Sequence, residues 1–209
     1  VLARAAVRVM PKGTFVAQRG FPAVVAVRAL GGAAFGGVGA YLPLLLTLQH
    51  HFSPSRAGVT LSITGVCWAF GSWLQGRDHG IERVRVLQAG LAFMTVGLVV
   101  TSLLAWTDAT TWFGLIGWGF AGVGMGLSSS SLSVLTLDLS DHHNSGRNSS
   151  AGQMAATMSI ATALAVSGTL LAFNADNPRP WVFGSIITAG AVMAAVGLLA
   201  ATRVRRAEG

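Results

Sequence analysis

Residues 86–106, VLQAGLAFMTVGLVVTSLLAW, run for 21 positions without a charged side chain. An α-helix of about 20 mostly apolar residues spans the roughly 30 Å hydrocarbon core of a bilayer. The stretch also lacks the strict alternation of polar and apolar residues that marks a strand of a membrane barrel. It therefore predicts a transmembrane helix.

Five further stretches have the same character and complete a set of six: 21–48, 57–76, 112–137, 150–173 and 181–202. The polar segments between them are too short to hold a soluble domain. The sequence thus predicts an all-α integral membrane protein, a six-transmembrane-helix bundle over residues 21–202. A basic cytoplasmic linker, residues 1–20, precedes the bundle, and a cytoplasmic tail, residues 203–209, follows it.

The composition indicates a lipid bilayer as the surroundings of this chain. Apolar residues make up 52% of it and charged residues only 10%, whereas about a quarter of the residues of a soluble domain are charged. The formal net charge of +7 raises the alternative of a nucleic-acid-binding protein. The basic residues lie between the apolar stretches and form no patch, so we expect no nucleic-acid partner. A single cysteine, Cys67, excludes an intramolecular disulfide.

The basic residues also predict the orientation, since Lys and Arg in short loops stay on the cytoplasmic side. With the N-terminus inside, only Arg56 and Arg179 fall outside. Eleven basic residues fall inside: Arg4, Arg8, Lys12, Arg19, Arg77, Arg83, Arg85, Arg147, Arg203, Arg205 and Arg206. Trp106, Trp112 and Trp181 then lie at the outer interface, where indole rings are favoured. Both termini are therefore expected in the cytoplasm. The strong excess of arginine over lysine indicates a GC-rich bacterial genome and hence the bacterial cytoplasmic (inner) membrane.

Glycines at helical spacing predict close contacts between helices, because helices in lipid associate through small residues. Gly32 and Gly36 stand four apart in the first span. A second set shares one face of the fourth span: Gly119, Gly122 and Gly126. Packing within one bundle is favoured over dimerisation. Pro43 removes a backbone donor from the first helix and predicts a kink there, used either for gating or for packing.

Several segments, taken together with the six-helix topology, resemble one known family. They are Pro11-Lys12-Gly13-Thr14 to Arg19-Gly20-Phe21-Pro22, then Leu42-Pro43-Leu44, then Gly71 to Arg77 with Arg83, Arg85 and Gly90, then Gly122 to Leu127, and finally Gly146 to Gln153. In that order they are similar to parts of the second half of actinobacterial drug-transporter-like members of the major facilitator superfamily. Those parts are the central linker, the seventh helix, the loop between helices eight and nine, the tenth helix, the cytoplasmic loop after it and the start of the eleventh.

This resemblance implies two six-helix halves, each made of two inverted three-helix repeats, with a substrate path between the halves near the membrane midplane. The chain would supply the C-terminal half. It begins without methionine and with what resembles a linker, so a missing N-terminal six-helix half is the expected partner. Gln75 departs from the Gly-x-x-x-Asp-Arg loop signature of the family at its acidic position. That departure weakens any charge-relay gate built on this loop.

Five residues are candidates for the substrate pathway. Arg28 is the only charge inside a predicted span, so it either serves gating or substrate binding, or it snorkels to inner headgroups about 10 Å away. Ser128, the first of four serines in a row, either bonds back to its own helix or lines a polar cavity. Tyr41, Trp118 and Gln153 lie on helices whose counterparts in the family line the pathway.

Five residues near the inner helix ends are candidates for gating: Gln75, Arg77, Arg85, Asp138 and Arg147. Asp138 ends the fourth span. It is expected to pair with Arg147, to take up a proton, or to be an ordinary interface carboxylate.

No metal site, cofactor site or catalytic site is expected. His50-His51 and His142-His143 are adjacent pairs in loops, where neighbours rarely face one metal ion, and no third ligand is near. Ser128 follows Gly126-Leu127, but no histidine lies within a span to act as the base of a serine protease, so no enzyme is predicted. Phosphate-cradling glycine motifs and cofactor motifs are absent from the sequence.

The expected function is transport of a small-molecule substrate by alternating access, as proton-coupled efflux or as facilitated transport. No carboxylate lies in the middle of a span, so a coupling acid would have to sit in the missing half. The alternative is a complete small six-helix membrane protein that pairs with a second copy to form a homodimeric pore or scaffold.

Overall fold

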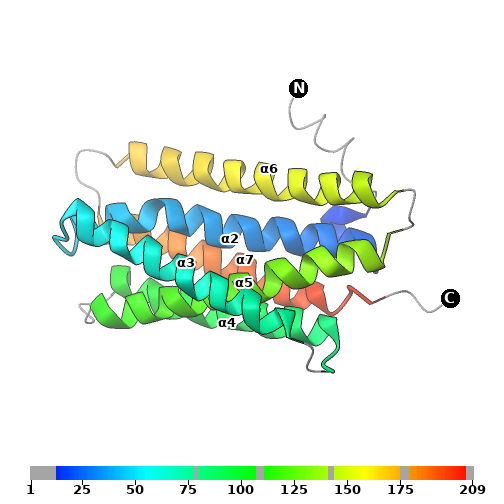
Figure 1. Cartoon of the computed structure of the whole chain (residues 1–209). Coiled ribbons are helices and arrows are strands. Elements are labelled where there is room, and N and C mark those ends of the chain that lie inside the picture. The colour runs from blue at the N-terminus through cyan, green and yellow to red at the C-terminus, as the bar shows by residue number, and fades with distance from the viewer. Residues whose placement is uncertain (1–12, 78–79, 107–110, 141–143, 175–178, 206–209) are drawn as a thin grey trace.

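The computed structural model describes residues 13–77, 80–106, 111–140, 144–174 and 179–205. A short 3-10 helix, η1 (Thr14–Val16), precedes six long α-helices. The six are α2 (Phe21–Leu48), α3 (Pro54–Gly76), α4 (Arg83–Trp106), α5 (Thr111–Asp138), α6 (Ser145–Ala172) and α7 (Pro180–Ala201). All six are long and apolar enough to cross a membrane, and they lie side by side in one bundle (Figure 1).

Several helices extend farther into polar sequence than the apolar stretches do. α6 begins at Ser145 rather than at residue 150, and α4 begins at Arg83 rather than at residue 86. α3 begins at Pro54, where the Ser53 hydroxyl accepts a hydrogen bond from the backbone N–H of Arg56 at 3.4 Å. Hydropathy marks the part of a helix that fits in hydrocarbon, whereas backbone hydrogen bonding continues into its polar ends.

The pairing of helices shows an internal two-fold pattern. α2 packs against α6 and α7, α5 packs against α3 and α4, and α4 also contacts α7. Exchanging α2 with α5, α3 with α6, and α4 with α7 leaves this set of contacts unchanged. Because consecutive helices alternate in direction, the second three-helix unit is inverted relative to the first (Figure 1). The two inverted three-helix repeats that the family resemblance implied are therefore present.

Glycines allow these helices to approach backbone to backbone. A Cβ atom at Gly97 of α4 would fall on the backbone nitrogen of Ala121 in α5. Gly32 and Gly36 of α2 face Ile160 of α6. Three glycines of α5 face α3: Gly119, Gly122 and Gly126. The prediction that these glycines pack within one bundle is confirmed. The helix that contains Pro43 continues past it to its end at residue 48.

Both ends of the described chain lie at one end of the bundle. The N–H of Gly20 donates to the carbonyl of Arg203 at 3.1 Å, and the guanidinium of Arg203 donates to the carbonyl of Val16 at 3.0 Å. We call this the basic end, because it carries seven of the described arginines: Arg19, Arg77, Arg83, Arg85, Arg147, Arg203 and Arg205. Arg56 and Arg179 lie at the opposite end, where α3 and α7 begin.

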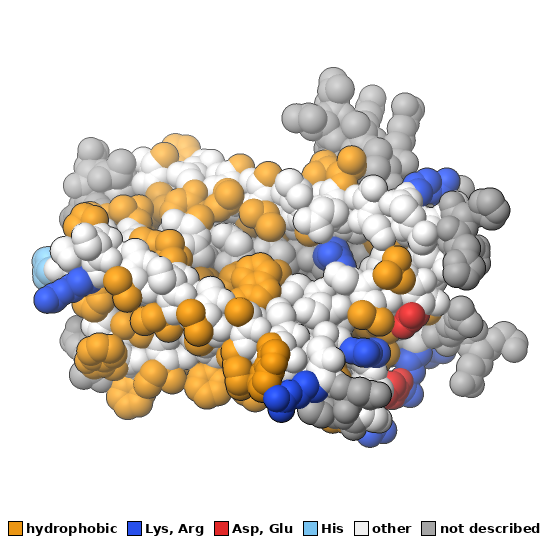
Figure 2. All heavy atoms as spheres, in the orientation of Figure 1, with side chains coloured by type: hydrophobic (Ala, Val, Ile, Leu, Met, Phe, Trp, Pro, Cys, Tyr) orange, Lys and Arg blue, Asp and Glu red, His pale blue; other side chains and the backbone are white. Residues whose placement is uncertain are grey.

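On the face that Figure 2 shows, hydrophobic side chains are spread between these two ends, and nearly all charged side chains lie at the ends. This distribution is the one expected of a protein whose middle lies in hydrocarbon. Much of the predicted linker and tail, including Arg4, Arg8, Lys12 and Arg206, lies outside the described residues.

Candidate functional site

Two helices are much less covered than the other four. Of the most apolar 18 residues in each helix, 22% are buried in α3 and 17% in α6, against 44–56% in the others. α3 rests mainly on α5, and α6 rests mainly on α2, so α2 and α5 form a floor between them. We call this surface of α2, α3, α5 and α6 the open face; it includes Arg28, Phe35, Trp68, Ser133 and Gln153. Figure 2 shows that the molecule is hollowed there, between α6 and the helices below it.

Arg28 lies in the floor of the open face and joins three helices. Its guanidinium donates to Gln153 Oε1 of α6 at 3.4 Å and to Ser133 Oγ of α5 at 3.2 Å. The arginine lies against α6 beside Gly152, where a Cβ atom would sit in ordinary van der Waals contact, 3.5 Å from Arg28 Cδ. The structure thus brings together Arg28 and Gln153, which the sequence had singled out on separate grounds, and adds Ser133 to them.

Phe35 is the centre of an aromatic cluster on the same face, about two turns beyond Arg28 along α2. Its ring stacks on Trp118 of α5, with centroids 4.8 Å apart, and meets Trp68 of α3 edge-on at 5.6 Å. Trp118 is 2% exposed and Trp68 is 37% exposed, so Trp68 forms the accessible part of the cluster. The indole nitrogen of Trp118 is buried and has no hydrogen-bond partner in the part of the chain that the structure describes. Trp118 therefore lies beneath the surface of the open face.

Tyr41 ties α2 to α6 nearer the opposite end. Its hydroxyl donates to the backbone carbonyl of Leu164 at 2.9 Å. Gly168 permits this approach, because a Cβ atom there would lie 2.8 Å from the Tyr41 Oη. Ser159 adds a second polar link between the same helices by donating to the carbonyl of Ala29 at 2.7 Å. The hydroxyl of Tyr41 is thus engaged in helix packing.

Ser128 lies away from the open face. Its hydroxyl donates to the Gly124 carbonyl of its own helix at 2.7 Å. It faces α4, where a Cβ atom at Gly90 would lie 2.6 Å from the Ser128 Oγ. Of the two alternatives for Ser128, back-bonding to its own helix is the one that the structure shows. The serine that reaches the open face is Ser133, which only its spacing along the helix could have indicated.

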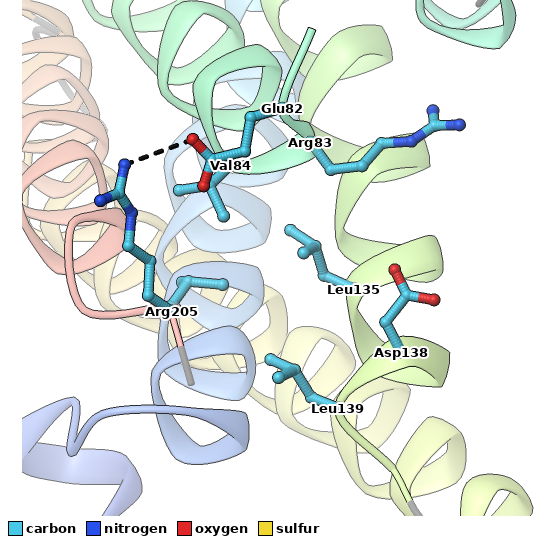
Figure 3. A pocket seen from close by; sticks show the side chains of 8 residues that line it. Glu82, Arg83, Val84, Leu135, Asp138, Leu139 and Arg205 are labelled. Carbon is cyan, nitrogen blue, oxygen red and sulfur yellow. Dashed lines mark hydrogen bonds and ion pairs between the residues drawn. The ribbon is translucent and has the colours of Figure 1, made fainter. Parts of the chain in front are cut away.

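A pocket of about 620 Å³ opens at the basic end, between α4, α5 and the segment after α7 (Figure 3). Glu82 is joined there to Arg205, with 3.3 Å between Oε2 and Nη2, and to Arg85, with 3.6 Å between Oε2 and Nε. Asp138 lines the side of the pocket formed by α5. Glu82 was not among the predicted gating residues, although its position between Arg77 and the two arginines Arg83 and Arg85 was a signal for it.

The remaining gating candidates do not converge on one site. The Gln75 side chain is buried, and its backbone carbonyl accepts a hydrogen bond from Arg83 at 3.4 Å. The Arg77 guanidinium lies 3.8 Å from the ring centroid of Trp73. Arg147 is exposed in the first turn of α6. Both ion pairs found among the described residues belong to Glu82, and a pair between Asp138 and Arg147, one of the three alternatives for Asp138, is not among them.

His50 contributes to local structure. His50 Nε2 lies 3.0 Å from the Leu104 carbonyl oxygen, and His50 Nδ1 lies 3.3 Å from Thr111 Oγ1, which links three helix ends. Within the described ranges, no group of three His, Cys, Asp or Glu side chains is placed to hold a metal ion. His142 and His143 lie outside those ranges.

Solved structures of larger transporters share this fold. A crystal structure of tetrameric PepTSo2 matches with a TM-score of 0.75 at 19% identity, covering 89% of this chain and 40% of that chain. A crystal structure of a POT family transporter in complex with a thioalcohol-conjugated peptide matches with a TM-score of 0.67 at 19% identity, covering 86% and 37%. The chain thus spans less than half the length of either structure. At this identity the likeness shows the fold alone. No curated protein matches the chain.

The sequence itself matches a family model over most of its length. The model described as Major Facilitator Superfamily matches residues 4–164, a range that includes the whole of the first four spanning helices. The six apolar helices, their two inverted repeats and this match agree with one another. The chain belongs to the major facilitator superfamily.

Proposed function

We propose that this chain is the C-terminal half of a transporter that moves small molecules across the bacterial cytoplasmic membrane by alternating access. The observation that supports this most directly is the open face. Arg28, Ser133 and Gln153 meet there within membrane-spanning helices, where contact of a charge and two polar groups with lipid is unfavourable. A second six-helix half packed over α3 and α6 would enclose them and leave a path between the halves.

The internal symmetry supports a moving interface. The α2–α6 contact and the α3–α5 contact are equivalent in the two-fold pattern, and both rest on small residues. Gly32 and Gly36 serve the first contact, and Gly122 and Gly126 serve the second. Because such surfaces have few interlocking side chains, helices shift against each other with little loss of packing. α3 and α6 are therefore the helices that we expect to change position between inward-open and outward-open states.

Proton-coupled efflux is the transport mode that we propose. The resemblance to drug transporters supports export. All acidic residues of the chain lie outside the apolar interior of the helices: Asp78, Glu82, Asp108, Asp138, Asp141, Asp176 and Glu208. The proton-binding carboxylate would then belong to the opposite half. The excess of arginine at the basic end supports a cytoplasmic location for that end.

The transport test uses the complete transporter, expressed from its full gene and reconstituted in proteoliposomes. The vesicles receive a mixture of small molecules, with and without an imposed proton gradient, and empty vesicles serve as the control. We expect transporter-dependent movement of at least one solute that increases with the gradient. Solute movement that is equally fast with and without the gradient would contradict proton coupling. Absence of transporter-dependent movement would contradict transport.

The location of the path is tested by thiol labelling in a background in which Cys67 is replaced by serine. Gln153→Cys, on the open face, is expected to react with a membrane-impermeant maleimide in the complete transporter. Val96→Cys is the control, because Val96 is 59% exposed on α4, where lipid should cover it. Equal protection of both cysteines would show that no aqueous path reaches the open face.

The homodimeric pore or scaffold remains the competing function. It requires that two copies of this chain face each other across their open faces. A particle that contains two identical six-helix chains in nanodiscs, as judged by its mass, would favour this alternative. A single polypeptide with a second, different six-helix half would favour the transporter.

A further inference from the structure

Arg28 is the one basic residue that lies far from a helix end in the described part of the chain. It is the eighth residue of α2, about 10 Å from the start of that helix. The other basic residues within helices fall in the first three positions: Arg56, Arg83, Arg85 and Arg147. Figure 2 shows a basic side chain set in the hollow of the open face, apart from the charges at the two ends. A charge at this depth needs partners.

The partners that this chain supplies are neutral. Arg28 Nη1 donates to the amide oxygen of Gln153 at 3.4 Å, and Nη2 donates to the hydroxyl of Ser133 at 3.2 Å. Arg28 Nε is buried and has no partner among the described residues. A guanidinium has five N–H donors, so these two bonds leave most of its capacity unused. Neutral acceptors orient the planar group, but they do not neutralise its charge.

Among the described residues, no carboxylate forms an ion pair with Arg28 either. The two ion pairs among the described residues both involve Glu82, at the basic end. Along α5, the acid nearest to Ser133 is Asp138, which is exposed at the last position of the helix and makes no ion pair with Arg28. An uncompensated charge within a spanning helix is unfavourable, and such charges face the bundle interior or a water-filled cavity and pair with opposite charges or carbonyl oxygens. The arrangement is therefore that of an incomplete anion site.

The surface next to this site suits the apolar part of an organic anion. Phe35 follows Arg28 by seven residues, which places it on the same side of α2 and about 10 Å farther along. The ring of Phe35 packs at a right angle to the ring of Trp68, and Trp68 is partly exposed. A molecule with a negative head at Arg28 can therefore place a ring or an aliphatic body against Trp68.

We propose that Arg28, oriented by Gln153 and Ser133, binds the carboxylate or phosphate group of the transported solute, and that the solute is an organic anion whose apolar part contacts Trp68. This proposal rests on the proposed function, because it takes the open face as one wall of the path. Carboxylate and phosphate match the planar donors of a guanidinium and form strong, charge-assisted hydrogen bonds with it. Arg28 is the binding residue, and Gln153 and Ser133 are positioning residues.

The binding test uses the complete transporter in phosphatidylcholine nanodiscs, in which no anionic lipid is present. Benzoate and phenyl phosphate are the probes, and benzamide is the neutral match for benzoate. We expect the anions, but not benzamide, to raise the unfolding temperature and to change tryptophan fluorescence. Arg28→Gln should weaken anion binding at least about ten-fold, which is the loss of a charge-assisted hydrogen bond. Arg28→Lys should retain part of the affinity, and Arg56→Gln, at the opposite end, should bind as the wild type does.

Several results would overturn the anion site. One is an equal response to benzoate and benzamide, and another is unchanged benzoate affinity in Arg28→Gln. Phosphatidylglycerol added to the nanodiscs tests the lipid source: if it abolishes benzoate binding through Arg28, a headgroup phosphate occupies the site and the solute assignment is wrong.

If Arg28→Gln does not fold, Gln153→Leu serves instead. This variant keeps the charge of Arg28 but should still weaken benzoate binding several-fold, and unchanged benzoate affinity in it counts against the proposal.

Uptake into proteoliposomes separates this proposal from the proposed function. A transporter that moves only neutral or cationic solutes would contradict the anion site and leave transport intact. A protein that binds benzoate through Arg28 but moves no solute would contradict transport and leave the anion site intact.

Discussion

Trp118 of α5 stacks on Phe35 of α2, with ring centroids 4.8 Å apart and ring planes at 9° to each other. These two helices are equivalent in the internal two-fold pattern, and they form the floor of the open face. Gly39 faces the indole, where a Cβ atom would lie 3.2 Å from the ring. The stacked pair therefore fixes the distance between α2 and α5 at the point where the two repeats meet.

Trp118→Ala is expected to lower the free energy of unfolding by about 3 kcal/mol, because removal of a buried aromatic side chain leaves a cavity. Trp118→Phe keeps an aromatic ring next to Phe35 and should lower it less. Detergent-induced unfolding of the complete transporter in mixed micelles measures the change. Trp112→Ala is the control, since Trp112 is 74% exposed. Equal stability of the two alanine variants would show that the stack does not hold the floor.

Gly97→Ala is expected to disrupt the contact between α4 and α5. The added Cβ atom would meet the backbone of Ala121, and a backbone cannot rotate away as the end of a side chain can. Overpacking of this kind typically lowers stability by about 1–3 kcal/mol. Gly58→Ala is the matched control, because a Cβ atom there meets nothing within 4 Å. The same unfolding measurement compares the two variants, and a Gly97→Ala protein as stable as Gly58→Ala would refute the backbone contact.

Tyr41→Phe is expected to lower stability by about 1 kcal/mol, the usual contribution of one hydrogen bond between membrane helices. The lost bond is the one that joins α2 to the Leu164 carbonyl of α6. Its removal should also speed hydrogen exchange in the half of α6 that lies away from the basic end. Thr169→Val is the control on the same helix, because the Thr169 hydroxyl bonds within its own helix, to Ala165. Unchanged exchange in α6 of Tyr41→Phe would argue against this link.

Glu82→Gln is expected to change stability by no more than about 1 kcal/mol, although it removes the ion pairs of Glu82 with Arg85 and Arg205. The side chains in these pairs are 45–72% exposed, so water and salt screen them. A stability loss of several kcal/mol, or one that high salt does not reduce, would show that the pocket is more enclosed in the complete transporter.

The basic end is expected to face the cytoplasm. Green fluorescent protein fused after Gly209 should therefore fluoresce in intact cells, whereas alkaline phosphatase inserted in the loop between α2 and α3 should be active. The reason is the excess of arginine at the end of the bundle where Gly20 contacts Arg203. Active phosphatase at the C-terminus would reverse this orientation.

The six spanning helices could be predicted because the relevant property is local. The preference of a stretch of about 20 residues for hydrocarbon is the sum of the preferences of its residues. The sequence of that stretch is therefore enough to predict it. The least accurate predictions were helix ends such as Ser145 of α6, because polar residues continue a helix outside the apolar region. Arg28 stood out for the same local reason, as a charge within an apolar stretch.

The partners of Arg28 could not be predicted in this way. Ser133 and Gln153 are more than 100 residues from Arg28 in the chain, and only the packing of α5 and α6 against α2 brings them together. Ser128 and Ser133 are only five residues apart, yet five residues turn a helix by about 140° from one face to another. The first therefore faces α4, and the second reaches the open face.

The sequence by itself determined that this chain spans a membrane six times and that one charge lies within a span, because solvent preference is a property of each residue and its neighbours. The tertiary structure decided which side of each helix faces the open face, which serine accepts from Arg28, and which tryptophan is accessible. Those outcomes depend on the angles and contacts of helices that are distant in the chain, and no single stretch of sequence contains them.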